Sequence, residues 1–254
     1  KLKRDGLLAT LSTMFVRPFE TYKKYKLDKK VGSTDIATAQ KKLAFQDSQK
    51  FIYENSSLST LSFNPPYAVK KLHTYCIENL PQKGHIFEFG VFKGKSINFF
   101  ANLLKDYEDS RRLFGFDSWK GFSEEWSGVN EVHPINYHDQ KGNLPKVEDN
   151  VILIDGFIEK TLPAFVEKNN IETIAFIHID TDTYSPAKVI LSNLKPYFQK
   201  GTIILFDELC GYPNWRSHEY KALTETLDKN EYEFIGFAHN GSRAYLTKSA
   251  IRIL

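Results

Sequence analysis

The feature that most constrains this fold is an alternation of short apolar runs with helical patterns, which begins near Pro65. Ile174–Ile179 is a nearly uninterrupted apolar run, as is typical of a parallel strand covered by helices on both faces. Tyr67–Asn79 has apolar side chains that recur on one helical face. Alternating units of this kind predict an α/β sandwich with a mostly parallel central sheet.

Seven strands are predicted, and the last two form a hairpin. The predicted strands are His85–Phe89, Arg112–Phe116, Val151–Ile154, Ile174–Ile179, Thr202–Phe206, Tyr232–Ala238 and Arg243–Thr247. Asn240-Gly241 between the last two is typical of a tight hairpin turn, so we expect an antiparallel hairpin at the C-terminus. Ser185-Pro186 predicts a helix start, with Ser185 as N-cap and Pro186 at the first helical position.

The first 62 residues differ in character from the rest. They are polar and rich in lysine, and they show helical spacing around Leu7–Tyr25 and Thr38–Tyr53. We predict an N-terminal helical cap or substrate lid over residues 1–62 and a ligand-binding domain over residues 63–254. The lysines of the first segment are interpreted as a solvated helix face or loop, with a partner-binding basic patch as the alternative.

Bulk composition excludes several classes of protein. Hydrophobic residues make up 41% of the 254, and the formal net charge is only +3, so neither nucleic acid nor a membrane surface is required as a partner. The chain has only two cysteines, Cys76 and Cys210, and no apolar run of membrane-spanning length. Cys76 lies on an apolar helix face and is expected in the core. These features favour a reducing compartment and predict a cytoplasmic location.

The segment Glu88–Ser96 joins a predicted strand to a predicted helix. Gly90 and Gly94 would let the backbone turn sharply and approach a ligand, and the helix N-terminus would favour an anionic group. The spacing differs from the dinucleotide pattern GxGxxG. Two glycines alone are equally well explained by a structural turn.

Asp117 ends the next predicted strand, where an acid can accept hydrogen bonds from two ribose hydroxyls. An N-cap or turn aspartate is the alternative. Gly156 follows the third strand in Asp155-Gly156-Phe157, and it would let an adenine ring lie against the backbone. Together with the glycine loop, these positions favour a ligand that carries a ribose.

Two segments carry a family resemblance. Glu88–Ser96 resembles the first motif of class I S-adenosylmethionine methyltransferases, in particular the catechol and caffeoyl-CoA O-methyltransferases and the TylF-like (macrocin-type) sugar O-methyltransferases. Phe116–Phe122 resembles the TylF-like ribose motif, and the similarity runs from about Pro65 to Leu227. The resemblance implies a Rossmann-like methyltransferase fold with S-adenosyl-L-methionine as cofactor. The implied cofactor-binding residues are Glu88, Gly90, Val91, Phe92, Gly94, Ser96, Asp117, Ser118, Gly156, Phe157, Ile158 and Asp180.

Three acids end two strands that are expected to be neighbours: Asp180, Asp207 and Glu208. Converging carboxylates repel one another unless a cation lies between them, and such oxygen ligands suit Mg²⁺, Ca²⁺ or Mn²⁺. The related O-methyltransferases bind a divalent metal at the matching positions, although Asp-Glu stands here where Asp-Asp or Asp-Asn is more usual. The alternative is that Asp180 and Asp207 cap helices and that Asp182 faces solvent.

The acceptor site is less strongly indicated. Candidates for the general base are Asp180, Asp182, His133 and His138, although a loop histidine is more often simply exposed. Candidates for substrate contact are Trp119, Tyr184, Tyr212, Trp215 and Arg216. The alternative for the aromatic residues is that they pack the loops onto the sheet.

These patterns predict a metal-assisted O-methyltransferase that acts on a sugar or a glycosylated small molecule. Three alternatives stay open: methylation of a nitrogen or a phosphorylated group, an NAD-dependent dehydrogenase, and a non-catalytic protein with the cofactor fold. A homodimer is a further expectation from the family, although no interface is visible in the sequence.

Overall fold

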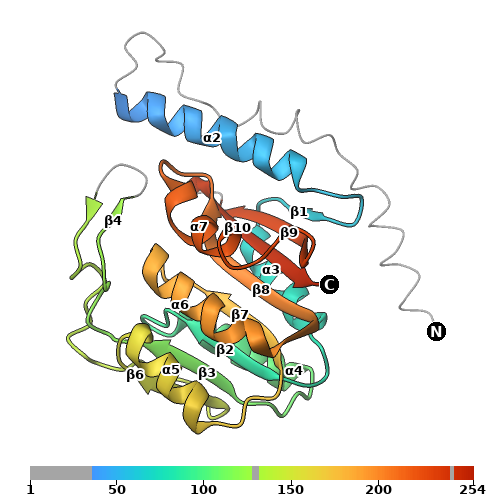
Figure 1. Ribbon diagram of the computed structural model, residues 1–254, viewed down its shortest axis with the longest axis vertical. Coiled ribbons are helices and arrows are strands. Elements are labelled where there is room, and N and C mark those ends of the chain that lie inside the picture. The colour runs from blue at the N-terminus through green and yellow to red at the C-terminus, as the bar shows by residue number, and fades with distance from the viewer. Residues whose placement is uncertain (1–35, 128–131, 241–242) are drawn as a thin grey trace. The chain divides into compact units, whose positions relative to one another are not determined.

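The computed structural model describes residues 36–127, 132–240 and 243–254, and its main feature is an eight-stranded sheet with helices on both faces (Figure 1). The predicted helix at Leu7–Tyr25 lies outside the described residues. The sheet consists of β1 (Leu61–Phe63), β2 (His85–Phe89), β3 (Leu113–Asp117), β6 (Val151–Asp155), β7 (Ile174–Ile179), β8 (Phe198–Cys210), β9 (Tyr232–Asn240) and β10 (Arg243–Ile253). β4 (Trp126–Ser127) and β5 (Val132–His133) form a separate two-stranded ribbon.

The strand order is β1-β9-β10-β8-β7-β2-β3-β6. β10 pairs antiparallel with both β8 and β9, and the other pairs described in this sheet are parallel. The predicted fold class, a mostly parallel sheet with a C-terminal antiparallel hairpin, is therefore confirmed. The prediction missed the edge strand β1, because three residues are too few to show a period of two.

The described helices are α2 (Ile36–Glu54), α3 (Ala68–Glu78), α4 (Lys95–Asp106), α5 (Ile158–Lys168), α6 (Tyr184–Leu194) and α7 (Glu219–Thr224). Two short 3-10 turns accompany them, η2 (Lys195–Tyr197) and η3 (Trp215–Ser217). α3 and α4 cover one face of the sheet, and α5, α6 and α7 cover the other (Figure 1). Because parallel strands need crossover connections, this arrangement follows directly from the alternating sequence pattern.

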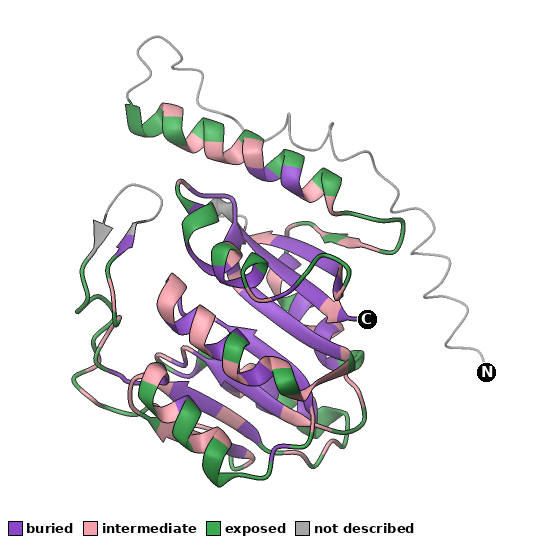
Figure 2. Ribbon diagram, in the orientation of Figure 1, coloured by how far each residue is buried: buried purple, intermediate pink, exposed green. Residues whose placement is uncertain are grey.

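Two apolar cores lie on the two faces of the sheet. Consecutive residues of β8 alternate between them: Ile204 and Phe206 pack on the side of α5 and α6, and Leu205 packs on the side of α3 and α4. The central strands are accordingly buried along their length (Figure 2). Burying each such side chain stabilises the fold by about 1.5–3 kcal/mol. Cys76 is fully buried in one of these cores, as predicted.

α2 confirms the helix predicted at Thr38–Tyr53. Phe51 on this helix is buried, and its ring lies 5.1 Å from Trp215 and 5.5 Å from Phe234, centroid to centroid. Residues 39–254 form one compact unit, so the boundary predicted at residue 62 falls inside it. None of the helices in the described ranges has the length and apolar character needed to cross a membrane.

The start of α6 differs from the prediction. The helix begins at Tyr184, with Thr183 as its N-cap, so Ser185 lies inside the first turn. The backbone N–H and the hydroxyl of Ser185 both donate to the carboxylate of Glu124, each at 2.7 Å. A carboxylate from a distant loop thus satisfies the helix start, which sequence spacing does not reveal.

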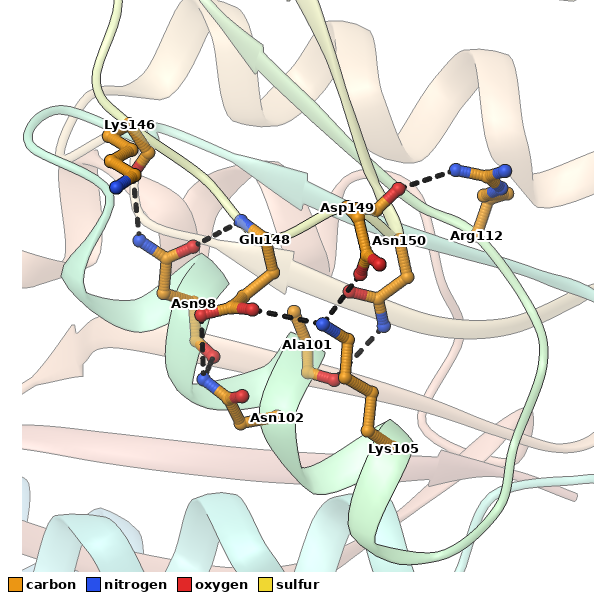
Figure 3. Close-up of polar contacts among 9 residues, drawn as sticks. All are labelled: Asn98, Ala101, Asn102, Lys105, Arg112, Lys146, Glu148, Asp149 and Asn150. Atoms are coloured by element: carbon orange, nitrogen blue, oxygen red, sulfur yellow. Dashed lines mark hydrogen bonds and ion pairs between the residues drawn. The ribbon is translucent and has the colours of Figure 1, made fainter.

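Polar contacts fasten the segment before β6 to α4, the helix that follows the glycine loop (Figure 3). Lys105 lies 2.9 Å from a carboxylate oxygen of Glu148 and 2.6 Å from one of Asp149. The side chain of Asn98 accepts the backbone N–H of Glu148, and Asn150 donates to the carbonyl of Ala101. Exposed ion pairs contribute little individually, so we attribute to this network positioning rather than stability.

Candidate functional site

A pocket of about 280 Å³ opens at the carboxyl ends of β2, β3, β7 and β8. This is the edge of a parallel sheet at which ligands bind in open α/β folds. Many predicted site residues line it. These are Gly90, Phe92, Asp117, Ser118, Trp119, His138, Phe157, Ile158, Asp180, Asp182, Asp207 and Glu208. Sequence reasoning therefore located the pocket and most of its lining.

Gly90 lies where β2 and β7 come closest at the pocket floor. Its φ is +89°, and a Cβ at this position would lie 1.8 Å from the carbonyl oxygen of Asp180. The backbone N–H of Asp180 donates to the carbonyl of Phe89 at 2.8 Å. Only glycine fits this position, and the absence of its side chain brings the glycine loop into contact with the acidic strand end.

Asp117 organises the glycine loop. Its Oδ2 accepts the backbone N–H groups of Val91 and Phe92 at 2.9 and 2.7 Å, and its Oδ1 accepts that of Trp119 at 2.8 Å. Charge-assisted hydrogen bonds of this length are stronger than neutral ones. The carboxylate thus holds two loops in place while it lines the pocket in which a ribose is expected.

Glu88 and Ser96 contact each other and not the pocket. Glu88 is fully buried, the hydroxyl of Ser96 donates to its Oε1 at 2.9 Å, and His178 Nδ1 is hydrogen-bonded to its Oε2 at 3.2 Å. Burial raises the pKa of Glu88, and the contacts with His178 and Ser96 oppose that rise. His178 is a buried, hydrogen-bonded core histidine. Val91, Gly94 and Gly156 likewise lie outside the pocket lining.

The predicted acids converge. Asp180, Asp182, Asp207 and Glu208 all line the pocket, although Asp207 and Glu208 are consecutive residues of one strand. Pairing between β8 and β10 explains this, because Cys210 pairs with Thr247 whereas Phe206 pairs with Ser249. One β10 residue therefore faces three residues of β8. Such irregularities re-aim side chains next to functional sites.

That single β10 residue is Lys248, which the sequence analysis missed. Lys248 is buried, and its Nζ donates to Oδ2 of Asp207 at 2.6 Å and to the Asp207 carbonyl at 3.0 Å. Burial alone would raise the pKa of Asp207, but the charges of Lys248 and His178 hold it well below its usual range. Lys248 is the sole charged residue between Ala244 and Ile251, and this isolated charge in a strand was the available signal.

His178 is the second positive group beside Asp207, with its Nε2 3.9 Å from Oδ1 of Asp207. Burial alone would lower the pKa of His178, but its contacts with the carboxylates of Asp207 and Glu88 outweigh this effect and raise the pKa to about 10. A buried line of polar side chains thus joins α4 to β10 across the sheet, through Ser96, Glu88, His178, Asp207 and Lys248. Each carboxylate in this buried line has a cationic neighbour.

The positive groups act less on the other acids, for which burial and neighbouring carboxylates dominate. Burial, followed by the charges of neighbouring carboxylates, raises the pKa of Asp180 and Asp182 well above the usual range and that of Glu208 to about 8. Glu219, another acid that the sequence analysis missed, is fully buried on α7. Oε2 of Glu208 and both carboxylate oxygens of Glu219 have no hydrogen-bond partner among the described residues. Hard oxygen donors of this kind suit a divalent cation, although the described side chains whose ligand atoms lie within 4.8 Å of one another are His73, His178 and Asp207.

Strained backbone conformations gather around the pocket. Phe92, Trp119, His138 and Asp182 are non-glycine pocket residues with positive φ, between +48° and +66°. Such residues persist only where the surrounding structure enforces them, and they cluster at functional sites. For Asp182 the strain accompanies a carboxyl group held inside the pocket.

The residues predicted to contact the acceptor are mostly occupied with packing. Trp119 and Trp215 are buried and Tyr212 is fully buried, which favours the alternative that these aromatic residues hold the loops on the sheet. The Arg216 guanidinium pairs with Asp47 of α2, with two donors at 2.8 Å, and lies 4.1 Å from the Trp215 ring centroid.

Tyr184 and the histidines complete the set of predicted residues. The hydroxyl of Tyr184 donates to Glu225 at 2.6 Å, and Tyr184 does not line the pocket. His138 lines it, with its ring 4.7 Å from that of Phe92. The side chain of His133 lies outside the described residues.

Comparisons with known proteins agree with this geometry. Residues 87–209, which include the glycine loop and the acids Asp180, Asp182, Asp207 and Glu208, match the model of a family described as a methyltransferase domain. Residues 87–209 therefore form a methyltransferase domain. The match spans β2 to β8, which are the strands whose ends form the pocket.

Solved structures of methyltransferases share the fold. Calicheamicin methyltransferase CalS11 superposes with a TM-score of 0.55 at 23% identity, covering 87% of this chain and 94% of CalS11. The O-methyltransferase NovP superposes with a TM-score of 0.51 at 18% identity, covering 72% of this chain and 78% of NovP. Identities this low show a common fold for the methyltransferase domain. A search of curated proteins found no match.

Proposed function

We propose that this methyltransferase transfers a methyl group to a hydroxyl of a sugar or a glycosylated small molecule. The observation that carries the proposal is the contact between the glycine loop and the acidic strand end at Gly90 and Asp180. It brings a candidate cofactor site and a cluster of proton acceptors together in one pocket. Methyl transfer to oxygen needs both, because the hydroxyl must lose a proton as the new bond forms.

In this proposal, the ribose of the cofactor lies against Asp117 and Ser118, and its adenine lies near Phe157 and Ile158. The carboxylate of Asp117 accepts three backbone N–H groups, and about one further lone pair stays available to a ribose hydroxyl. When bound, S-adenosylmethionine would supply the methyl group, and its sulfur would leave as the thioether of S-adenosylhomocysteine, in line with the attacking oxygen. The chain's own contribution is to hold donor and acceptor in that line, which provides much of the rate.

Asp182 is the proposed general base. It lines the pocket in a strained conformation beside Glu208, and its carboxyl lacks the lysine partner that Asp207 has. The hydroxyl proton of the acceptor would pass to Asp182, and the hydroxyl oxygen would form the new bond to the methyl carbon. Because Asp180 lies two residues away at the same strand end, it is the nearest alternative base.

Asp180, Asp207 and Glu208 are the proposed ligands of a divalent cation such as Mg²⁺. When bound, the cation would lower the pKa of the acceptor hydroxyl and neutralise the cluster. The unpartnered Oε2 of Glu208, a residue of the pocket lining, supports this assignment. Treatment with EDTA should abolish methyl transfer and Mg²⁺ should restore it, whereas full activity after EDTA treatment would remove the metal from the proposal.

A sugar acceptor is supported by the printed description of CalS11 as a TDP-rhamnose 3'-O-methyltransferase, a protein of the same fold. Isothermal titration with S-adenosylmethionine tests the cofactor site, and binding at micromolar concentration is expected. Acceptors are then screened by mass spectrometry for the gain of one methyl group. Methylation of amines alone would contradict the proposed hydroxyl acceptor, and no cofactor binding at millimolar concentration would contradict the whole proposal.

Three further predictions concern the N-terminal segment, the oligomeric state and the cellular location. The segment 1–62 is proposed to act as a lid over the acceptor, the protein is proposed to form a homodimer, and its location is proposed to be cytoplasmic. Deleting residues 1–35 should raise the KM for the acceptor and leave the Kd for the cofactor unchanged. Light scattering during size-exclusion chromatography measures the oligomeric state.

A further inference from the structure

Asp207 differs from the other pocket acids because it already has a cationic partner inside the protein. Lys248 Nζ lies 2.6 Å from its Oδ2, and the side chains of Lys248 and Asp207 are 10% and 17% exposed. A carboxylate and an ammonium this well shielded from solvent attract each other far more strongly than an exposed pair. Any divalent cation that binds Asp207 must therefore share it with Lys248.

The position of Lys248 is built into the sheet. The register of β8 and β10 changes between Thr247 and Ser249, so Lys248 lies opposite the segment that contains Asp207 and Glu208. Its ammonium also donates to the Asp207 backbone carbonyl at 3.0 Å, so two bonds anchor it. Backbone pairing on both sides of β10 keeps the lysine at this place. The ammonium is a fixed part of the cluster.

We propose that Lys248 is an internal competitor for the divalent cation, because its ammonium holds Asp207 and thereby weakens metal binding by the acidic cluster. The inference rests on the metal site of the proposed function. Two positive charges at one carboxylate repel each other, so the ammonium lowers the affinity for the metal. Loss of the Lys248 charge leaves a cluster of buried acids whose remaining positive neighbour is His178. Such a cluster binds a divalent cation more tightly.

The test is a titration with Mn²⁺, a hard cation suited to carboxylates, monitored by calorimetry and by electron paramagnetic resonance. Lys248→Met should bind Mn²⁺ at least tenfold more tightly than the wild-type protein, which corresponds to about 1.4 kcal/mol. Lys248→Arg keeps the charge and should bind no more tightly than wild type. Equal or weaker binding by Lys248→Met would overturn the inference, as would the absence of Mn²⁺ binding by both proteins.

A double variant tests whether the gain in Mn²⁺ affinity depends on the ion pair between Lys248 and Asp207. Asp207→Asn with Lys248→Met removes both charges, and it should lose the affinity gained by Lys248→Met alone. Lys195→Met is the matched control, because Lys195 pairs with Glu231 near the start of β8, at the opposite end of that strand from Asp207. Its Mn²⁺ affinity should equal that of wild type. A gain in Lys195→Met equal to that in Lys248→Met would overturn the assignment to Lys248.

If Lys248→Met folds poorly, the shift of its melting temperature on adding Mn²⁺ gives a second measure of Mn²⁺ binding. Mn²⁺ should raise the melting temperature of Lys248→Met by more than that of wild type, since ligand that binds only the folded state stabilises it. A variant that stays unfolded in excess Mn²⁺ would overturn the inference. Titration with S-adenosylmethionine runs in parallel, because loss of cofactor binding would remove the proposed function while leaving the Mn²⁺ result interpretable.

Discussion

The two halves of the pocket are built in different ways. On the cofactor half, backbone groups define the shape: Gly90 permits close approach, and Asp117 accepts three backbone N–H groups. On the acidic half, charged side chains define the site, and Lys248 and His178 offset part of the negative charge. Shape defined by backbone tolerates no added atom, whereas a charge cluster can be tuned one residue at a time. The two halves should therefore respond differently to substitution.

The largest effect is expected at Gly90. In Gly90→Ala the new methyl group would lie 1.8 Å from the Asp180 carbonyl oxygen, so β2 and β7 must separate. We expect cofactor affinity, measured by calorimetry, to fall by more than a hundredfold. Gly142→Ala is the matched control, because Gly142 also has positive φ, +74°, but its nearest neighbour is a flexible lysine carbon at 3.9 Å. Similar losses in both variants would show that backbone conformation, and not close approach, is decisive.

The next effect is expected at Asp182, on the acidic half. Asp182→Asn keeps the shape and removes the proposed base, so kcat should fall by about 10²–10⁴-fold. The Kd for S-adenosylmethionine should stay within a factor of two or three of wild type, on the order of the usual context dependence of such effects. Asp139→Asn, in an exposed loop, serves as the control. An unchanged kcat would assign the proton to another group, with Asp180 at the same strand end as the next candidate.

A stability effect is expected at Glu88, which lies between the two halves. Glu88→Ala leaves Nδ1 of His178 without its buried partner, and loss of one member of a buried pair costs about 3–5 kcal/mol. Urea unfolding followed by circular dichroism measures this change. Glu78→Ala removes an exposed hydrogen bond to Tyr107 and should cost less than about 1 kcal/mol. If both variants lose the same free energy of unfolding, the buried contact of Glu88 stabilises the fold no more than an exposed hydrogen bond does.

The smallest effect is expected at Asp47, outside both halves. Asp47 pairs with Arg216, and both side chains are more than a third exposed, so Asp47→Asn should cost about 0.2–1 kcal/mol. The Arg216 hydrogen bond lowers the pKa of Asp47, although burial opposes the shift. The stabilisation is therefore present above the ordinary aspartate pKa and is lost as the pH falls through the lowered value. Urea unfolding should show the full wild-type advantage at pH 7 and a smaller one as the pH falls below the ordinary aspartate pKa.

Much of the fold could be predicted because its signals are local. The apolar run Ile174–Ile179 and the helical spacing of Tyr67–Asn79 identify β7 and α3 without any knowledge of neighbours. The ends of elements were less accurate. β8 runs from Phe198 to Cys210, well beyond the predicted Thr202–Phe206, because pairing with β7 reaches back to Phe198 and pairing with β10 reaches Cys210 through polar residues. Periodicity reports which face is buried, not how far a partner strand reaches.

The sequence by itself determined the alternating sheet, the glycine loop and the acids at the strand ends, because each depends on residues adjacent in the chain. Only the tertiary structure decided what those acids contact. Lys248 meets Asp207 from a strand 41 residues away through a register change, and Glu219 joins the cluster from α7. Charges interact through space at distances that chain spacing does not encode. Whether a carboxylate faces a metal, a lysine or another carboxylate therefore depends on the folded arrangement.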